Sequence, residues 1–305
     1  MRTTLLVGLL FVGCGVAEAE LNDVGADVSS EEGELGTSTR SYVVLRRDNR
    51  RCVAPLCGGY WAHDVNRATL NEQYVSALDF SRSDLRMPED QADVTGAPDF
   101  EVVLYGKLGP KEARFNTRTF VVSSAWRGMP GMKFNEPADT FFRVESANIQ
   151  CITAPCPSLR ATKLHTATKF LHHDLDVTRA SVPLLDQNWL TFRVIEKDSL
   201  VAGRFVDGAT VGVGQEKVLD ASQVFVHLPD QTQSCPRYAL AQCPAGKANI
   251  FTRNENRCQL PAGCAMSGTC RFATPTCTEG YNLVSWPGGA YSCTQHACDP
   301  AFLHD

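Results

Sequence analysis

The sequence predicts a mainly β protein made of two tandem, homologous small domains, each a β-barrel or β-sandwich, followed by a disulfide-rich region. Three observations support this prediction. A cysteine loop occurs twice, 99 residues apart, as Cys52-Val-Ala-Pro-Leu-Cys57 and Cys151-Ile-Thr-Ala-Pro-Cys156. The segments around both loops are short, β-branched or aromatic, and bounded by Gly, Pro, Asn or Asp, as strands are. Eight more cysteines follow residue 234. We therefore divide the chain after residue 39 into residues 40–131, 132–230 and 231–305.

Residues 1–14 have the form of an export signal, with one basic residue, a short apolar run and small residues at its end. The run is shorter than the ~20 apolar residues that span a membrane. Its last residues, Phe11-Val12-Gly13-Cys14, resemble the lipobox of bacterial lipoproteins. The resemblance implies cleavage before Cys14, a lipid anchor on its sulfur and an outer-membrane location. The alternative is ordinary cleavage after Ala17-Glu18-Ala19, which would give a secreted or periplasmic protein.

Residues 15–39 carry seven acidic residues and no basic one, and they lack an apolar period, so we expect an acidic, flexible linker. The whole chain has a formal net charge of -5, and the part after the linker is close to neutral. A near-neutral body gives no electrostatic reason to expect a nucleic-acid partner.

The first copy contains five expected strands, at residues 42–46, 59–65, 74–80, 100–108 and 119–126, with a helix at residues 88–93. Five strands with a helix after the third follow the order of an OB-like barrel, which is one possibility for each domain. The second copy repeats the pattern: Leu78-Asp-Phe-Ser-Arg82 matches Leu175-Asp-Val-Thr-Arg179, and Leu104-Tyr-Gly-Lys-Leu108 matches Val201-Ala-Gly-Arg-Phe205. The shared polar residues are Asp79/Asp176, Ser81/Thr178, Arg82/Arg179 and Lys107/Arg204. They indicate either a repeated polar site or a turn with an ion pair, and we favour the turn because such exposed pairs are common.

The chain has 13 cysteines, and setting Cys14 aside leaves an even number that can all pair outside the cytoplasm. The expected disulfide cysteines are Cys52, Cys57, Cys151, Cys156, Cys235, Cys243, Cys258, Cys264, Cys270, Cys277, Cys293 and Cys298. Each repeated loop is read as a short disulfide rather than a metal site, because thiolate sites usually use closer cysteine pairs. The tail forms two modules of four cysteines, and each module allows three pairings.

Three features occur in only one copy. The run Arg46-Arg-Asp-Asn-Arg-Arg51 suits a phosphate, an acidic glycan or a lipid A-type head group, but such runs are more often solvated turns. His172 and His173 with Asp174 and Asp176 offer metal ligands, although neighbouring strand residues point to opposite faces. Gly212-Val-Gly214 is read as a turn rather than a phosphate loop.

The sequence contains no catalytic, cofactor or metal-binding motif, so we expect neither an enzyme nor a cofactor. A triad assembled from distant residues would instead make the chain a cryptic hydrolase. The favoured function is a binding or structural module of the cell envelope, held at the membrane by its lipid and contacting a protein or an envelope glycan. The tail is similar to antistasin-type inhibitor modules, which implies a protease inhibitor as the alternative, with Arg271 as a contact.

Residues 40–230, with both cysteine loops, resemble an uncharacterised repeated domain of predicted myxobacterial lipoproteins. The resemblance implies an exported protein of unknown role, and it supplies no functional residues.

Overall fold

The structure is a computed structural model that describes residues 39–67, 72–135, 138–212, 214–230, 235–270 and 273–303. The expected signal, Cys14, the acidic linker and Arg271 lie outside these residues. Among the described residues, no helix is both long and apolar enough to cross a membrane.

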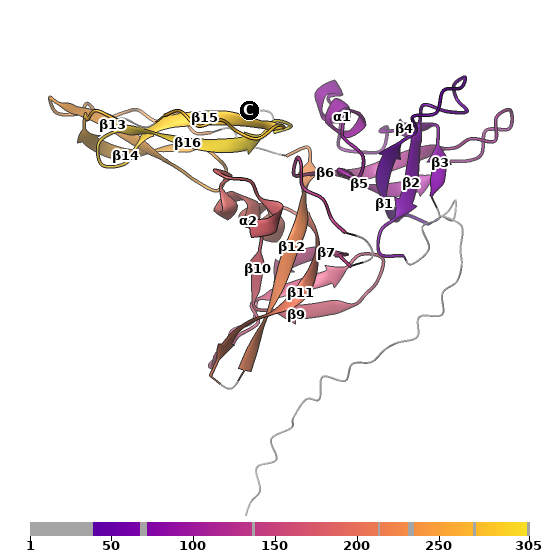
Figure 1. Ribbon diagram of the computed structural model, residues 1–305, viewed down its shortest axis with the longest axis horizontal. Helices are drawn as coiled ribbons and strands as arrows, with labels where there is room; N and C mark the ends of the chain where they lie inside the picture. The colour runs from indigo at the N-terminus through magenta and orange to yellow at the C-terminus, as the bar shows by residue number, and fades with distance from the viewer. Residues whose placement is uncertain are drawn as a thin grey trace, which may run out of the picture. The chain divides into compact units, whose positions relative to one another are not determined.

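The described chain is mainly β, as expected. The first half of the main sheet contains β1 (Ser41–Arg47), β2 (Tyr60–Asp64), β3 (Gln73–Val75), β4 (Ala77–Asp79), α1 (Pro88–Thr95), β5 (Val102–Leu108) and β6 (Thr119–Gly128). The second half contains β7 (Thr140–Ser146), β8 (Leu159–Lys163), β9 (Lys169–His172), β10 (Asp174–Asp176), the 3-10 helix η1 (Thr178–Ala180), α2 (Gln187–Glu196), β11 (Leu200–Val211) and β12 (Gly214–Leu228). The tail contains β13 (Lys247–Arg253), β14 (Gln259–Met266), β15 (Tyr281–Gly288) and β16 (Cys293–Pro300) (Figure 1).

The two halves share one open sheet, with the strand order β3-β2-β1-β5-β6-β12-β11-β7-β8-β9. In addition, β4 lies parallel to β6, and β10 lies parallel to β12. The sheet is not closed into a barrel, so the expectation of tandem OB-like barrels is not confirmed, although each half keeps the expected succession of strands with a helix after the third. The last strand of each half is long enough to pair with both halves. In β6, residues 119–121 pair with β4 of the same half, and residues 125–128 pair with β12 of the other half. In β12, residues 218–220 pair with β10, and residues 225–228 pair with β6.

The joint between β6 and β12 has a two-fold pattern. Arg127 pairs with Val226, and these residues are 99 apart, which is also the spacing of the two cysteine loops. On either side, Trp126 pairs with His227 and Gly128 pairs with Phe225. Exchanging the two halves maps one of these pairs onto the other. The antiparallel joint thus places equivalent strands of the two halves around a local pseudo-two-fold axis.

Glycine at the same place in each half allows the same irregularity in the sheet. β5 shifts its register on β6 at Gly106, and β11 shifts its register on β12 at Gly203. A Cβ atom would lie 2.2 Å from the Val121 carbonyl oxygen at Gly106, and 2.4 Å from the Asp220 carbonyl oxygen at Gly203. Both strands therefore need glycine for close approach of the backbones.

Aromatic side chains fill the core beneath the joint. Trp126, Phe141 and Phe225 are buried together, and the Phe141 and Phe225 ring centroids are 5.7 Å apart. The Trp126 indole Nε1 donates a hydrogen bond to the Asp198 carbonyl oxygen at 2.7 Å, so the buried polar group is satisfied. The helix α2 packs on the other, larger core cluster through Trp189, Leu190 and Val194. It begins where the Asp186 carboxylate accepts from two backbone N–H groups of its first turn.

The tail consists of two β-hairpins, β13–β14 and β15–β16. Each is closed by two disulfides of the same pattern, in which the first cysteine bonds the third and the second bonds the fourth. The pairs are Cys235–Cys258, Cys243–Cys264, Cys270–Cys293 and Cys277–Cys298. The structure thus selects one of the three pairings that the sequence left open for each module.

Candidate functional site

Two disulfide loops occupy equivalent turns of the sheet. Cys52–Cys57 closes the connection between β1 and β2, and Cys151–Cys156 closes the connection between β7 and β8, each with a Cα–Cα distance of 5.7 Å. The prediction of disulfide bonding is confirmed for both loops. Each loop presents a branched apolar side chain directly after its first cysteine: Val53 is 79% exposed and Ile152 is fully exposed.

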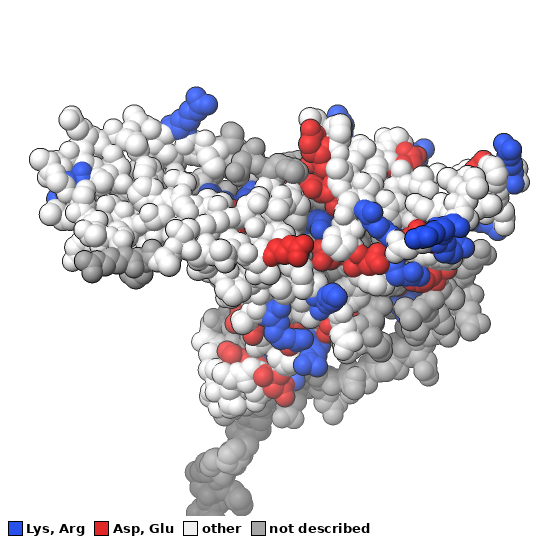
Figure 2. Space-filling model, turned by 45° about the horizontal axis from the view of Figure 1, so that its top comes forward, with Lys and Arg blue, Asp and Glu red and all other residues white. Residues whose placement is uncertain are grey.

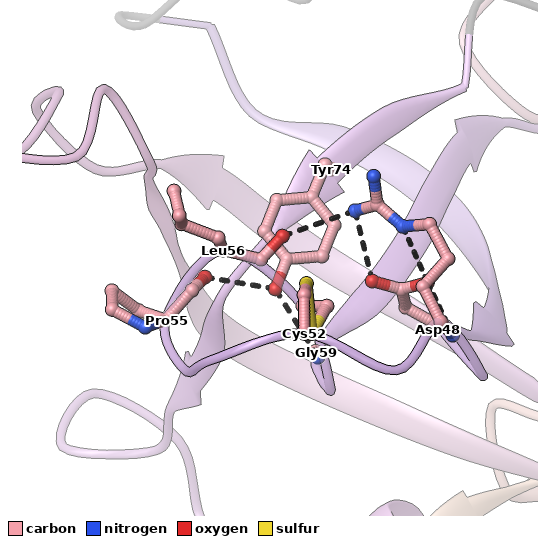
Figure 3. The surroundings of a disulfide bond; sticks show 8 residues. Asp48, Cys52, Pro55, Leu56, Gly59 and Tyr74 are labelled. Carbon is pink, nitrogen blue, oxygen red and sulfur yellow. Dashed lines mark hydrogen bonds and ion pairs between the residues drawn. A yellow bond between two sulfur atoms is a disulfide. The ribbon is translucent and has the colours of Figure 1, made fainter.

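Tyr74 of β3 holds the first loop from inside, as Figure 3 shows. Its hydroxyl donates to the Pro55 carbonyl oxygen at 2.9 Å and accepts from the Gly59 backbone N–H at 3.3 Å. Arg50 adds a hydrogen bond to the Leu56 carbonyl oxygen at 3.1 Å. The loop is therefore fixed by hydrogen bonds as well as by its disulfide.

The arginine run serves the protein's own structure. Arg50 pairs with Asp48 through two side-chain hydrogen bonds, of 2.8 and 2.9 Å, and its guanidinium lies 5.0 Å from the centroid of the Trp61 ring. The hydrogen bond from Arg50 lowers the pKa of Asp48 to about 2. Arg46 pairs with Glu72 at 2.6 Å, and Arg47 donates to a backbone carbonyl at the end of α1. Arg46 and Arg47 end strand β1, so only the second part of the run lies in the expected turn, and the contacts of its arginines are structural ones within the chain.

An aromatic-lined cavity of about 810 Å³ lies beside the joint of the two halves. Its lining residues are His63, Glu72, Asp99, Phe100, Met132, Lys133, Phe134 and Asn135. The Phe100 and Phe134 rings meet edge to face with centroids 6.3 Å apart, and Phe134 also packs on Phe141 of the joint core. The cavity thus combines a hydrophobic wall with carboxylate, amide and ammonium groups, which is the usual make-up of a small-ligand site.

Phe100 has a strained backbone at this cavity. Its φ angle is +65°, a conformation that bulky residues rarely adopt, and its side chain is 36% exposed. The Phe100 N–H donates to the Leu45 carbonyl oxygen at 2.7 Å, and the neighbouring Asp99 carboxylate accepts from the Arg47 backbone N–H at 2.7 Å. Backbone strain of this kind gathers at binding sites, where the surrounding contacts hold it in place. The cavity could not be predicted from the sequence, because its lining residues come from four separate segments.

The shared polar residues form the same turn in both halves. The Asp79 carboxylate accepts from the Ser81 N–H at 2.9 Å, and the Asp176 carboxylate accepts from the Thr178 N–H at 2.8 Å. The hydrogen bond from the Ser81 backbone lowers the pKa of Asp79, and the hydrogen bonds from the Thr178 side chain and backbone lower the pKa of Asp176. The contacts favour the turn interpretation, although the ion pair is different from the expected one, because Arg179 pairs with Asp220.

The two neighbouring histidines do not converge. His172 is completely buried, with its Nδ1 3.0 Å from the Asp174 carbonyl oxygen, and burial lowers its pKa. The His173 Nδ1 instead accepts from the Lys217 backbone N–H at 2.8 Å. Among the described residues, no three metal-ligating side chains come together. Gly212, with a φ of +61°, lies in the turn between β11 and β12, as expected.

One serine–histidine contact was not expected. The Ser285 Oγ lies 2.8 Å from the His296 Nδ1, across the β15–β16 hairpin, where the two residues are directly paired. Both side chains are on the exposed side of a two-stranded hairpin, and no carboxylate of the described chain bonds the imidazole. The contact is a cross-strand hydrogen bond rather than a triad.

Comparisons with known proteins identify the family without a function. An uncharacterized protein from Dictyostelium discoideum is 27% identical over 270 residues, which cover 86% of this chain and 88% of that protein. An alignment of that extent runs past residue 231 and into the cysteine-rich tail. No solved structure matches the chain. The domain of unknown function DUF6748 matches residues 41–231, which is more than half of the chain. The chain therefore belongs to the DUF6748 family.

Proposed function

We propose that the chain is an exported lipoprotein, anchored in the outer membrane through Cys14, that acts as a non-enzymatic binding module of the cell envelope. The described residues contain six disulfides, which indicate an oxidising compartment. The lipid anchor rests on the lipobox resemblance of residues 11–14. Rigid, disulfide-closed loops support a binding role, because little conformational entropy remains to be lost on association.

The observation that carries the binding role is the aromatic-lined cavity with its strained Phe100. A ring exposed at the cavity rim can stack on the apolar face of a sugar, while Glu72 and Asp99 retain lone pairs that accept from hydroxyl groups. Lys133 and Asn135 are exposed and add donors to the lining. This chemistry fits an envelope glycan better than a purely apolar ligand.

Isothermal titration of the mature protein with soluble peptidoglycan fragments and with lipopolysaccharide core oligosaccharide tests this role. We expect binding to one of the two, weakened about fivefold by Phe100→Ala, because stacked aromatic contacts contribute on the order of 1 kcal/mol. Phe170→Ala is the matched control, since Phe170 is similarly exposed but lies on β9, away from the cavity lining. Absence of binding to both glycans, or equal weakening by the two substitutions, would argue against the cavity.

Anchoring is tested separately by intact mass of the mature protein and by membrane fractionation. We expect a chain that begins at Cys14, carries acyl groups and has no free thiol. Cys14→Ser is expected to release the protein into the soluble fraction, because acyl chains supply the membrane affinity. A mature chain that begins after Ala19 without a lipid would show that the protein is secreted or periplasmic instead.

A second candidate function, protease inhibition, is favoured by one segment of the tail. Residues 236–242 are exposed and without helix or strand, and disulfides at Cys235 and Cys243 hold both ends. A rigid exposed segment of this kind can enter a protease cleft, with Arg237 or Leu240 as the contact. Titration of the full chain against trypsin and subtilisin tests it, with Arg237→Ala as the variant. Full protease activity at micromolar concentrations of the protein would remove this candidate.

A further inference from the structure

We propose that the first half of the sheet contains a site for a phosphate or sulfate group, formed by Arg82, Lys107, Lys111 and Arg118. These four side chains line one open cavity of about 700 Å³, together with Asp79, Ser81, Leu108, Gly109, Pro110 and Val121. The site is separate from the aromatic-lined cavity, and it depends neither on the lipid anchor nor on the proposed glycan binding.

The pseudo-symmetry of the sheet provides an internal comparison. In the first half, Val121 of β6 pairs with Asp79 of β4 and with Lys107 of β5. In the second half, Asp220 of β12 pairs with Asp176 of β10 and with Arg204 of β11. Val121 and Asp220 therefore occupy the same position in the two halves, between equivalent neighbours.

In the second half, the Asp220 carboxylate lies between two cations. It accepts from the Arg179 Nη1 at 2.5 Å and lies 3.7 Å from the Arg204 Nε. The fold thus contains an anion position between the arginine of the turn and the basic residue of the neighbouring strand. In this half the chain fills that position itself.

In the first half, the same two cations remain but the carboxylate is missing. Arg82 and Lys107 correspond to Arg179 and Arg204, whereas Val121 supplies only an apolar side chain. Within the described residues, neither Arg82 nor Lys107 makes an ion pair with a carboxylate. An oxyanion from outside can therefore take the position that Asp220 takes in the other half.

Two further cations line the cavity of the first half. The residue that corresponds to Arg118 in the second half is Lys217, and it pairs there with Asp207. Lys111 and Arg118 line the same cavity, and the Arg118 Nη1 is buried without a hydrogen-bond partner in the described chain. A buried guanidinium N–H without an acceptor is costly, so an oxyanion that accepts from it would gain free energy.

The acidic residue of the cavity does not prevent anion binding. The Asp79 carboxylate accepts from the Ser81 N–H, as Asp176 does from Thr178. Asp176 lies next to Asp220 in the ladder, so the fold already accommodates an anion beside this turn. Four cations against one carboxylate favour a dianionic group over a single carboxylate, and arginine forks match the geometry of tetrahedral oxyanions.

The first experiment measures binding of inorganic phosphate and of sulfate to the mature protein by isothermal titration, against chloride at equal ionic strength. We expect one phosphate or sulfate per chain. Val121→Asp is expected to weaken this binding by about tenfold or more, because it places a carboxylate where Asp220 stands in the other half. Binding no stronger than that of chloride, or binding unchanged by Val121→Asp, would overturn the proposal.

The second half supplies the matched control. Asp220→Val removes the internal carboxylate, so this variant is expected to bind a second phosphate or sulfate. A stoichiometry that stays at one anion per chain would contradict the proposed equivalence of the two positions. If Val121→Asp does not fold, the double variant Arg82→Gln, Lys111→Gln replaces it, because both side chains are exposed. Unchanged phosphate affinity in the double variant likewise overturns the site.

The source of the group is distinguished with lipid vesicles. Sedimentation with phosphatidic acid vesicles, compared with phosphatidylcholine vesicles, tests for a lipid phosphate. Sedimentation that Val121→Asp abolishes supports the site and identifies a membrane phosphate as its ligand. Binding of inorganic phosphate without vesicle binding supports the site with a soluble or glycan-borne group. Vesicle binding that Val121→Asp leaves unchanged counts against the site.

Discussion

Phe100 illustrates how a single residue can store backbone strain next to the aromatic-lined cavity. The ring contributes to the cavity wall, but any side chain at this φ angle places its Cβ close to its own backbone. The neighbouring β5 begins only at Val102, whereas the sequence indicated a strand from residue 100. The contact pattern of the cavity, not the local sequence, determines the conformation of this residue.

Comparing Phe100→Gly with Phe100→Ala isolates this strain. Both variants lose the ring, but only alanine keeps a Cβ at a positive φ angle, so we expect the glycine variant to be more stable by about 1 kcal/mol. Phe170→Gly and Phe170→Ala in β9 serve as the control pair. In a strand, the glycine variant should be less stable than the alanine variant by about 0.5–1 kcal/mol. Urea denaturation of the four variants gives both differences, and the same sign at both positions would contradict the strain at Phe100.

Asp48 gives a residue-scale prediction of pH dependence. Its pKa is about 2 in the folded protein, below the ~3.9 of an unfolded aspartate, so the pair with Arg50 stabilises the fold fully above about pH 4. This contribution is lost as the pH falls toward 2. We expect Asp48→Asn to lower the free energy of unfolding at pH 7 and to have little effect near pH 2. Asp207→Asn, in an exposed pair with Lys217, should change little at either pH.

At the scale of elements, the short β-branched and aromatic segments predicted most strands but not the partners of those strands. The expected strand at residues 74–80 is two short strands, β3 and β4, because Ser76 turns the chain from pairing with β2 to pairing with β6. The expected helix at residues 88–93 is α1. The open sheet was not predicted, because the pairing of β6 with β12 joins segments about a hundred residues apart.

The two cavities could not be predicted from the sequence for a related reason, because contacts between distant segments form them. Both loops and all twelve disulfide cysteines were visible in the sequence because a spacing repeats. The aromatic-lined cavity and the basic cavity depend on residues that meet only after folding. Val121 is an ordinary strand residue in the sequence. Its importance follows only from the strand register, which gives it the position in the first half that Asp220 has in the second half.

The β6–β12 joint gives an element-scale prediction. Trp126 and Phe225 are equivalent residues of the two halves, and both are almost fully buried in one aromatic cluster. We expect Trp126→Ala and Phe225→Ala each to lower the free energy of unfolding by about 3–5 kcal/mol, because each leaves a large cavity. Phe170→Ala should cost less, since Phe170 is partly exposed. Chemical denaturation checks the values, and losses below about 1 kcal/mol would show that the joint is not a packed core.

At the scale of the whole molecule, the shared sheet means that the halves are not independent domains. A fragment of residues 138–230 would leave the β12 edge and Phe225 without their partners. Because the joint is pseudo-two-fold, two copies of this fragment can pair through β12 with Val226 opposite Val226. Two copies of residues 39–131 would instead place Arg127 opposite Arg127, and like charges directly opposite each other destabilise a strand pair.

We therefore expect the fragment of residues 138–230 to form a dimer and the fragment of residues 39–131 to remain monomeric or poorly folded. Glu101 belongs to the same fragment and pairs with Arg127 at 2.7 Å, which reduces this repulsion. Arg127→Val removes the remaining charge and bulk, so this variant should allow the first fragment to dimerise too. Analytical ultracentrifugation measures the oligomeric state of each fragment, and circular dichroism shows whether the fragment is folded. Stable, folded monomers of either fragment would show that each half closes without the other, and the continuous sheet would then not be the unit of folding.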